Sequence, residues 1–274
     1  MKITFLGGGN MATALIGGML ERGFAVAGLQ VVELGEAARD ALAQRFGVRA
    51  VESFDDAALA CDVLVLAVKP QQMKAALAPI AGRLCGQLVI SIAAGLRLAD
   101  LGRWLGAPGA PHARLVRCMP NTPALIGAGV TGLYADPSVD AAGRETAGRI
   151  LGAVGSTVWA DDEAQMDAVT AISGSGPAYV FHFIEALESA GRSLGFDEAG
   201  ARRLAIDTVL GAARLAAGSE DAPAVLRQKV TSKGGTTEAA LASLAAAGWH
   251  DELVAAVQAA EARGRELGAE LGKD

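Results

Sequence analysis

The chain has 274 residues and a formal net charge of -6 at pH 7, from 24 basic and 30 acidic residues. This length fits one large domain or two modest ones, and an acidic balance without a basic block argues against nucleic acid as a partner. Hydrophobic residues make up 51% of the chain but aromatic ones only 4%, which favours helices packed through small side chains.

Cysteine usage and the N-terminus predict where the protein resides. The three cysteines show no C-x-x-C spacing, so we expect reduced thiols. Met1 leads into an apolar stretch without a signal-peptide pattern, and no apolar run reaches the roughly 18 residues of a membrane span. We therefore expect a soluble, cytoplasmic protein with no membrane partner. The three histidines lack metal-ligand spacing, and no metal site is expected.

The first part of the chain alternates strand-like and helix-like segments. Strands are expected at Ile3–Leu6, Leu29–Val32, Val63–Val68, Leu88–Ile92, Leu115–Cys118, Gly129–Tyr134 and Thr157–Trp159. Helices are expected at Met11–Arg22, Glu36–Phe46, Met73–Leu84 and Arg144–Val154. This alternation predicts an α/β domain over residues 1–160, a Rossmann-type doubly wound parallel sheet.

After Asp161 the pattern becomes helical throughout. A helix over Glu163–Ile172 is interrupted at Ser173–Gly176, and Pro177 begins the next one, which ends near Leu194. Asp197 is a suitable N-cap for a helix that continues to about Ala217. Further helices are expected over Glu238–Ala247 and Asp251–Leu271. Residues 161–274 are therefore predicted to form an all-helical C-terminal domain.

A glycine loop follows the first strand and opens the first helix. Gly7, Gly9 and Ala12 match the pattern G-x-G-x-x-A, with Asn10 and Met11 between them. In a dinucleotide site the first glycine makes the tight turn, the second admits the pyrophosphate, and the alanine keeps the helix near the sheet. The alternative is a glycine-rich turn with no ligand.

Glu33 ends the second strand, 24 residues after Gly9. An acid there can bind the ribose 2′-OH of NAD and would repel the additional phosphate of NADP, so the sequence leans toward NADH. Leu34 stands where an arginine would have favoured NADPH, but Arg39 or Arg45 could still reach that phosphate, and Glu33 could equally be a solvated charge.

A second candidate anion site is the run Thr231–Glu238, in which Gly234 and Gly235 sit among hydroxyl side chains before an alanine-rich helix. Such a loop can direct backbone N–H groups and hydroxyls at one small anion, with help from the helix dipole. The alternative is a helix N-cap with a loop glycine pair.

Other polar or small segments end strands of the predicted sheet, at the edge where ligands bind in this architecture. Ala67-Val68-Lys69-Pro70-Gln71 follows the third strand, where its lysine and glutamine could contact a ribose or simply form a proline-bearing turn. Ala93-Ala94-Gly95 follows the fourth, and its small residues let backbone approach a flat ring. The loop Arg117–Pro123, which contains Asn121, is braced by two prolines.

With these segments in hand, the chain resembles the pyrroline-5-carboxylate reductase family. The resemblance is carried, in the order of the family, by Gly7–Ala12, Val68–Gln71, Met119–Pro123, Ser173–Tyr179 and Thr231–Glu238. The first motif is shared with many dehydrogenases, whereas the last two together are specific.

The resemblance implies an NAD(P)H-dependent oxidoreductase acting on the CH–NH group, which transfers hydride to C5 of the cyclic imine 1-pyrroline-5-carboxylate and gives L-proline. It implies a helical domain that interlocks with a second copy, an active site at that interface, and in many members a larger ring such as a decamer of five dimers. The substrate carboxylate would be bound by Ser232, Gly235, Thr236 and Thr237. The candidate catalytic residues would be Thr170, which orients the imine or passes a proton, and Glu220, an acid near the imine.

The resemblance implies most of the expected cofactor contacts. Glu33, Val68 and Asn121 are added to them because each lies at or just after the end of a predicted strand. The full expected set is Gly7, Gly9, Asn10, Met11, Ala12, Glu33, Ala67, Val68, Lys69, Pro70, Ala93, Ala94, Gly95 and Asn121. Thr170 has an alternative role, a hydrogen bond to a carbonyl of its own helix.

Two other functions remain open at this point. A β-hydroxyacid-type dehydrogenase would share the plan, but its chemistry uses a lysine in the helix after the Ser173–Pro177 break, and none lies there. A non-catalytic dinucleotide sensor would keep the fold and lose turnover.

Overall fold

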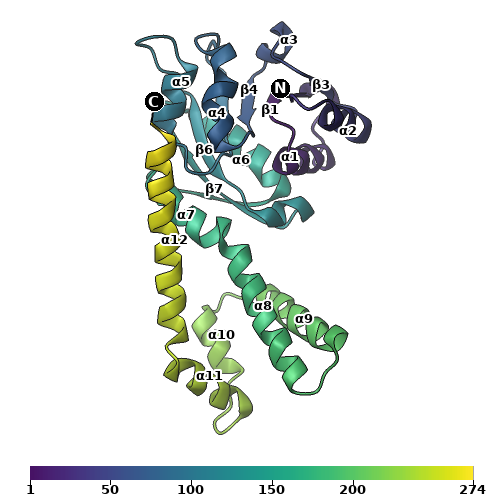
Figure 1. Cartoon of the computed structure of the whole chain (residues 1–274), viewed down its shortest axis with the longest axis vertical. Helices are drawn as coiled ribbons and strands as arrows, with labels where there is room; N and C mark the ends of the chain where they lie inside the picture. Colours follow the sequence, from purple (N-terminus) through teal and green to yellow (C-terminus); the bar gives the residue numbers. More distant parts are fainter. Residues whose placement is uncertain (274) are drawn as a thin grey trace. The chain divides into compact units, whose positions relative to one another are not determined.

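The computed structural model describes residues 1–273, and internal contacts divide the chain into two compact units (Figure 1). The first unit contains residues 1–175 together with the segment from Ala260 onward, and the second contains Gly176–Ala259. The sequence analysis placed a boundary at residue 160, where the periodicity changes. Each unit is described below by itself.

The first unit is built on an eight-stranded sheet with the order β3-β2-β1-β4-β5-β6-β7-β8. The strands are β1 Ile3–Leu6, β2 Leu29–Val32, β3 Arg49–Val51, β4 Val63–Leu66, β5 Leu88–Ser91, β6 Leu115–Met119, β7 Gly129–Ala135 and β8 Gly155–Trp159. All neighbouring pairs are parallel except β6 with β7. The predicted doubly wound sheet is confirmed, with one antiparallel pair that the sequence analysis did not anticipate.

The helices of this unit are α1 Asn10–Glu21, α2 Glu36–Phe46, α3 Asp56–Leu59, α4 Pro70–Leu77, α5 Leu98–Leu105, α6 Ala141–Leu151 and α7 Gln165–Val169. Short 3₁₀ turns occur at η1 Val26–Gly28, η2 Ala78–Ile80, η3 Thr122–Ile126 and η4 Gly152–Val154. The helix expected over Met73–Leu84 instead begins at Pro70, since proline fits the first turn, and changes to a 3₁₀ turn at Ala78.

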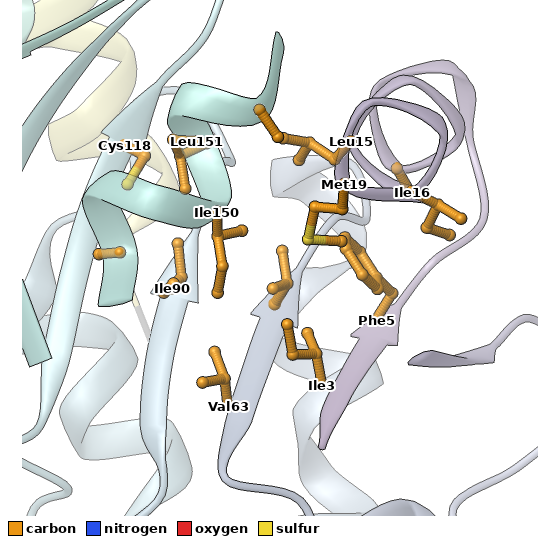
Figure 2. Close-up of a cluster of buried hydrophobic side chains, with 14 of the residues drawn as sticks. Ile3, Phe5, Leu15, Ile16, Met19, Val63, Ile90, Cys118, Ile150 and Leu151 are labelled. Carbon is orange, nitrogen blue, oxygen red and sulfur yellow. The ribbon is translucent and has the colours of Figure 1, made fainter. Parts of the chain in front are cut away.

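Alternating strand side chains form an apolar layer on each face of the sheet. On one face Phe5 and Ile90 pack with residues of α1, α2 and α6; Figure 2 shows Met19 of α1 beside Phe5. On the other face Leu64 and Leu66 pack with residues of α3, α4 and α5. Burial of both faces explains why strand sequences such as Val63–Leu66 are uniformly apolar.

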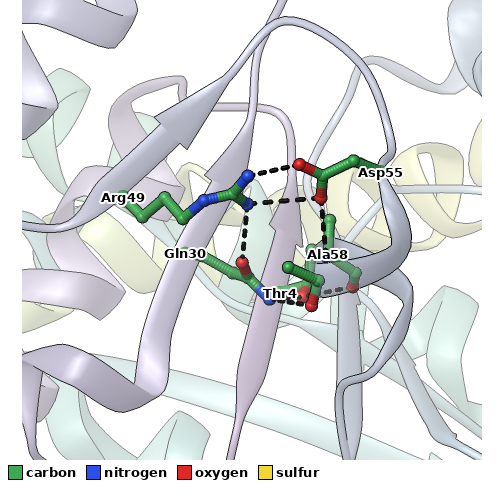
Figure 3. Close-up of polar contacts among 6 residues, drawn as sticks. Thr4, Gln30, Arg49, Asp55 and Ala58 are labelled. Atoms are coloured by element: carbon green, nitrogen blue, oxygen red, sulfur yellow. Dashed lines mark hydrogen bonds and ion pairs between the residues drawn. The ribbon is translucent and has the colours of Figure 1, made fainter.

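A polar network ties β1, β2, β3 and α3 together (Figure 3). The Gln30 amide donates to the Thr4 hydroxyl at 2.9 Å and accepts from the Arg49 guanidinium at 3.0 Å. Arg49 also pairs with Asp55, which caps α3 by accepting from the Ala58 N–H at 2.9 Å. The network fixes the segment between β3 and α3.

The second unit is helical. Its helices are α8 Gly176–Ser193, α9 Glu198–Ala217, α10 Pro223–Lys229, α11 Thr236–Ala246 and the first part of α12 Trp249–Leu271. In Figure 1, α8 and α9 lie side by side, and a Cβ added at Gly191 would lie 3.0 Å from the Cβ of Ala201. This unit exposes large apolar side chains, among them Phe181 at 60%. Within residues 1–273, no helix is both long enough and apolar enough to cross a membrane.

Candidate active site

The glycine loop between β1 and α1 has the geometry of a phosphate cradle. Gly7 has φ +99°, and a Cβ there would lie 2.8 Å from the carbonyl oxygen of Ala67, so only glycine fits. A Cβ added at Gly9 would meet open space. The loop backbone at Gly9 can therefore be approached closely by a ligand.

The N-terminus of α1 leaves backbone donors available. Gly9 is the N-cap and supplies no side-chain cap, and the first helical hydrogen bond runs from the Thr13 N–H to the Gly9 carbonyl at 2.9 Å. In the part of the chain that the structure describes, the N–H groups of Asn10, Met11 and Ala12 have no hydrogen-bond partner. Unpaired donors at the positive end of a helix dipole suit a diphosphate, so these residues fit the dinucleotide that the sequence predicts.

Glu33 folds back onto this loop. Its carboxylate accepts from the Gly8 N–H at 2.8 Å and from the Gly35 N–H at 2.9 Å. Arg39 donates to the carbonyl oxygens of Glu33 and Leu34, at 2.9 and 2.6 Å. Glu33 thus supports the loop, and each of its oxygens keeps a lone pair for a further donor.

A cavity of about 720 Å³ opens beside the glycine loop, along the carboxyl ends of β1 and β2 and the segments that follow β3 and β4. Its lining residues are Leu6, Gly7, Val32, Glu33, Leu34, Glu52, Ser53, Phe54, Val68, Gln71, Gln72, Ala75, Ala76 and Pro79. The lining is mostly apolar, carries two carboxylates, and has no basic side chain among the described residues. Its place at the switch between β1 and β4 is where doubly wound sheets bind nucleotides.

Glu52, Ser53 and Phe54 line this cavity from the segment after β3, and they are not among the site residues predicted from the sequence. β3 is only three residues long, too short for a period-2 pattern to reveal it. The polar Glu52-Ser53 pair directly after Val51 is the only signal that could have found them.

The next strand ends carry the remaining cofactor candidates. Lys69 is the exposed N-cap of α4. Ala93 is buried and Ala94 exposed, while Gly95 has φ +79°. The end of α12 covers this loop, since a Cβ added at Gly268 would lie 2.8 Å from the Gly95 carbonyl oxygen.

Thr170 begins a π-helical turn, Thr170–Gly174, whereas the sequence predicted a helix that continues to Ile172 and an interruption only at Ser173–Gly176. Its hydroxyl donates to the carbonyl oxygen of Met166 at 2.8 Å, the local role that sequence reasoning left as an alternative. The Asn121 side chain reaches the same turn: its amide donates to the Ser173 carbonyl at 3.1 Å and accepts from the Val130 N–H at 3.0 Å.

The candidate carboxylate site lies in the second unit, and α11 begins at Thr236, two residues earlier than predicted. Thr236 and Thr237 are therefore in its first turn, and within residues 1–273 their N–H groups and hydroxyls have no hydrogen-bond partner. The Gly235 N–H donates to the Ser232 carbonyl at 3.0 Å, and the Gly234 N–H donates to the Glu238 carboxylate at 2.6 Å. The turn leaves donors available at the start of an 11-residue helix.

The structure groups the predicted residues by unit. Gly7, Glu33 and Val68 line one cavity in the first unit. In the same unit Thr170 begins the π-helical turn, and Asn121 donates a hydrogen bond to it. Glu220, which is exposed, belongs to the second unit with the carboxylate turn.

Comparisons with known proteins give two family models along the chain and several full-length relatives. Residues 163–267 match the family model described as pyrroline-5-carboxylate reductase dimerisation, and residues 2–95 match that described as NADP oxidoreductase coenzyme F420-dependent. The chain is 48% identical to a pyrroline-5-carboxylate reductase of Pseudomonas aeruginosa, over 99% of this chain and 98% of the relative. It is 41% identical to that of Haemophilus influenzae, over 97% of each chain.

Solved structures that resemble this chain include members of the same family. A pyrroline-5-carboxylate reductase from Coxiella burnetii superposes with a TM-score of 0.92 at 40% identity, covering 97% of this chain and 98% of the other. A Plasmodium falciparum pyrroline carboxylate reductase with NADP bound superposes with a TM-score of 0.84 at 29% identity, covering 98% of each chain.

Proposed function

This chain belongs to the pyrroline-5-carboxylate reductase family, and we propose that it reduces the cyclic imine 1-pyrroline-5-carboxylate to L-proline with hydride from NADH or NADPH. One observation carries the proposal: two helices, α1 and α11, each begin at a glycine without a side-chain cap and leave backbone donors unpaired. One such end suits a diphosphate and the other a carboxylate.

The cofactor-binding residues that we propose are, with the exception of Asn121, those predicted from the sequence: Gly7, Gly9–Ala12, Glu33, Ala67–Pro70 and Ala93–Gly95. The open space at Gly9 and the unpaired N–H groups after it support a pyrophosphate there. When bound, the nicotinamide ring supplies the hydride, and the protein contributes positioning.

The substrate carboxylate is proposed to bind at Ser232, Gly235, Thr236 and Thr237. The free hydroxyls and N–H groups of the two threonines support this assignment, because an anion gains most from donors with no other partner. Fixing the carboxylate restricts the orientations that the substrate can adopt, which is the positioning that hydride transfer requires.

Thr170 is proposed to orient the imine rather than to act as an acid. Its hydroxyl proton is committed to the Met166 carbonyl, which leaves the oxygen as an acceptor. A substrate that enters with its nitrogen protonated can donate that N–H to the Thr170 oxygen, and no proton need leave the hydroxyl, which is a poor acid. Glu220, which is exposed, is proposed from the family resemblance as an acidic residue near the imine.

We propose NADH as the preferred cofactor. Glu33 and Glu52 both line the cavity beside the glycine loop, and two carboxylates repel the 2′-phosphate of NADPH. Arg39 is the first basic residue after Glu33 in the sequence and could otherwise attract the 2′-phosphate. Its guanidinium, however, donates to the carbonyl oxygens of Glu33 and Leu34.

The assembly is proposed to be an interlocked homodimer, which can associate further into a decamer of five dimers. The match to a dimerisation model and the exposed Phe181 and Phe183 in α8 support self-association. The cytoplasmic location stays a prediction from the sequence.

The deciding experiment is an assay of cofactor oxidation with 1-pyrroline-5-carboxylate, run with NADH and NADPH side by side. We expect turnover with both and a higher kcat/KM with NADH. No turnover with either cofactor, together with measurable dinucleotide binding, would favour the sensor; turnover only with a β-hydroxyacid and the oxidised cofactor would favour the other dehydrogenase class.

A further inference from the structure

Side chains of β6 and of the segment that follows it contact α7 and the π-helical turn that carries Thr170. Residues 117, 119 and 121 follow each other at intervals of two along β6 and its extension, so they lie on one face. Arg117 pairs with Asp167 at 2.9 Å, and a Cβ added at Gly174 would lie 2.5 Å from the Met119 Cε. Asn121 reaches the Ser173 carbonyl.

Arg117 fixes the start of this segment. Its side chain is 5% exposed and lies between Asp167 and Glu163, whose carboxylate is 3.3 Å away. The same Glu163 oxygen accepts from the Leu98 N–H at 2.8 Å, at the N-terminus of α5. Helix α7 is thus tied to β6 and α5 just before Thr170.

The end of the turn needs a donor from outside its own helix. In an α-helix the Ser173 carbonyl would accept from the N–H four residues on, but that residue is Pro177, which has none. The Asn121 amide supplies a donor at 3.1 Å. The turn itself is closed by the π-type bond from the Ser175 N–H to the Thr170 carbonyl, at 2.8 Å.

The Asn121 amide is already engaged at both ends. The residue is 8% exposed, its oxygen accepts from the Val130 N–H, and its nitrogen donates to Ser173. Such a side chain is suited to hold backbone in place, and this favours a structural contact to the turn over a direct contact to the cofactor.

We propose that Asn121 is a positioning residue for the reductase reaction: by donating to the Ser173 carbonyl it holds the π-helical turn in the arrangement that presents the Thr170 oxygen to the imine nitrogen. This rests on the role of Thr170 proposed above. It assigns to Asn121 an effect on turnover rather than on cofactor affinity.

The test compares two substitutions at one position. Asn121→Asp keeps the acceptor for the Val130 N–H but loses the donor to the Ser173 carbonyl, whereas Asn121→Ala loses both. If the contact to the turn matters, both variants lose about 10- to 100-fold in kcat, because a small displacement of an orienting group has effects of this size. The dissociation constants of NADH and NADPH, measured by titration, should stay within about twofold of the unsubstituted protein's, since the proposed role gives Asn121 no contact with the cofactor.

Two further readouts separate positioning from general damage to the fold. The carboxyl group introduced by Asn121→Asp can donate to the Ser173 carbonyl once it is protonated. The activity of that variant relative to the unsubstituted protein should therefore rise as pH falls, whereas that of Asn121→Ala should not. Hydrogen exchange at the Ser175 amide, which closes the turn, should be faster in both variants at neutral pH.

A double variant that combines Asn121→Asp with Thr170→Val separates the role proposed for Asn121 from the role proposed for Thr170. Thr170→Val alone should lower kcat, and adding Asn121→Asp to it should cause little further loss, because the oxygen being positioned is gone. Additive losses, or weakened cofactor binding with normal kcat, would overturn the positioning role and leave that of Thr170 standing. Unchanged kinetics in Thr170→Val would overturn both roles, and a chain with no turnover before substitution would overturn the proposed function itself.

Discussion

A single side chain, that of Glu33, contacts both the glycine loop and the adjoining cavity. It accepts from the N–H groups of Gly8 and Gly35, so it braces the glycine loop while it lines the adjoining cavity. Sequence reasoning located this residue from its spacing to Gly9, but it could not foresee the bonds to Gly8 and Gly35, which depend on how the two loops meet in space.

We expect Glu33→Gln to improve the affinity for NADPH relative to NADH by about 5- to 10-fold, because the negative charge facing the 2′-phosphate is removed while an acceptor oxygen remains. Titration of each dinucleotide into the purified variant measures this ratio. Glu36→Gln is the matched control, since Glu36 lies in the first turn of α2 and does not line the cavity. An equal change in both variants would argue for a general effect of charge.

We expect Thr237→Val to raise the KM for 1-pyrroline-5-carboxylate by about tenfold, because it removes one hydroxyl donor to a charged group. The KM for the cofactor should not change. Thr231→Val is the control, since the Thr231 hydroxyl is already bonded to the Arg227 carbonyl at 2.6 Å. A rise confined to the cofactor KM would contradict the carboxylate assignment.

At the scale of elements, helix α1 approaches its neighbours through glycines. A Cβ added at Gly18 would lie 2.6 Å from the carbonyl oxygen of Ala153, which is backbone and cannot rotate away. At the adjacent Gly17 a Cβ would lie 3.4 Å from the ring of Phe46, an ordinary contact. Two neighbouring glycines in one helix therefore have different roles.

We expect Gly18→Ala to destabilise the first unit by about 1–3 kcal/mol through overcrowding of η4. Gly17→Ala should be neutral or stabilise by up to about 1 kcal/mol, since alanine favours the helix. Urea unfolding followed by far-ultraviolet circular dichroism at one protein concentration measures both. Equal effects of the two substitutions would show that the contact with Ala153 does not limit packing.

The elements that the sequence predicted well have strong local signals. The β1 strand, its glycine loop and α1 combine an apolar run with a spaced motif, and β4 is apolar at every position because it is buried on both faces. The short β3 and α3 carry too few residues for a periodic pattern. β7 pairs antiparallel with β6, and the π-helical turn Thr170–Gly174 accepts a hydrogen bond from Asn121; local sequence does not specify either of these tertiary contacts.

At the scale of the whole molecule, apolar exposure is concentrated in the second unit. Val180, Phe181 and Phe183 of α8 are all exposed, as are Leu204 and Leu210 of α9. Apolar surface of this extent is typical of a protein interface, and residues 163–267 match a dimerisation model. The oligomer is therefore expected to form through this unit.

We expect Phe181→Glu to shift the protein from dimer toward monomer, because a charge would have to be buried in the interface. Sedimentation velocity over a range of concentrations measures the shift. Val26→Glu, at an exposed position of the first unit, is the control and should leave the association unchanged. Dimers of equal stability in both variants would place the interface elsewhere.

The return of α12 to the first unit has a consequence for synthesis of the chain. Gly268 packs against the Gly95 carbonyl, Leu271 packs on the apolar layer formed with α4 and α5, and the Gly272 carbonyl accepts from Arg103 at 3.1 Å. When the sheet has left the ribosome, the residues that cover the Ala93–Gly95 loop have not yet been translated. That loop therefore stays uncovered while the helical unit is synthesised, and the end of α12 can cover it only after that.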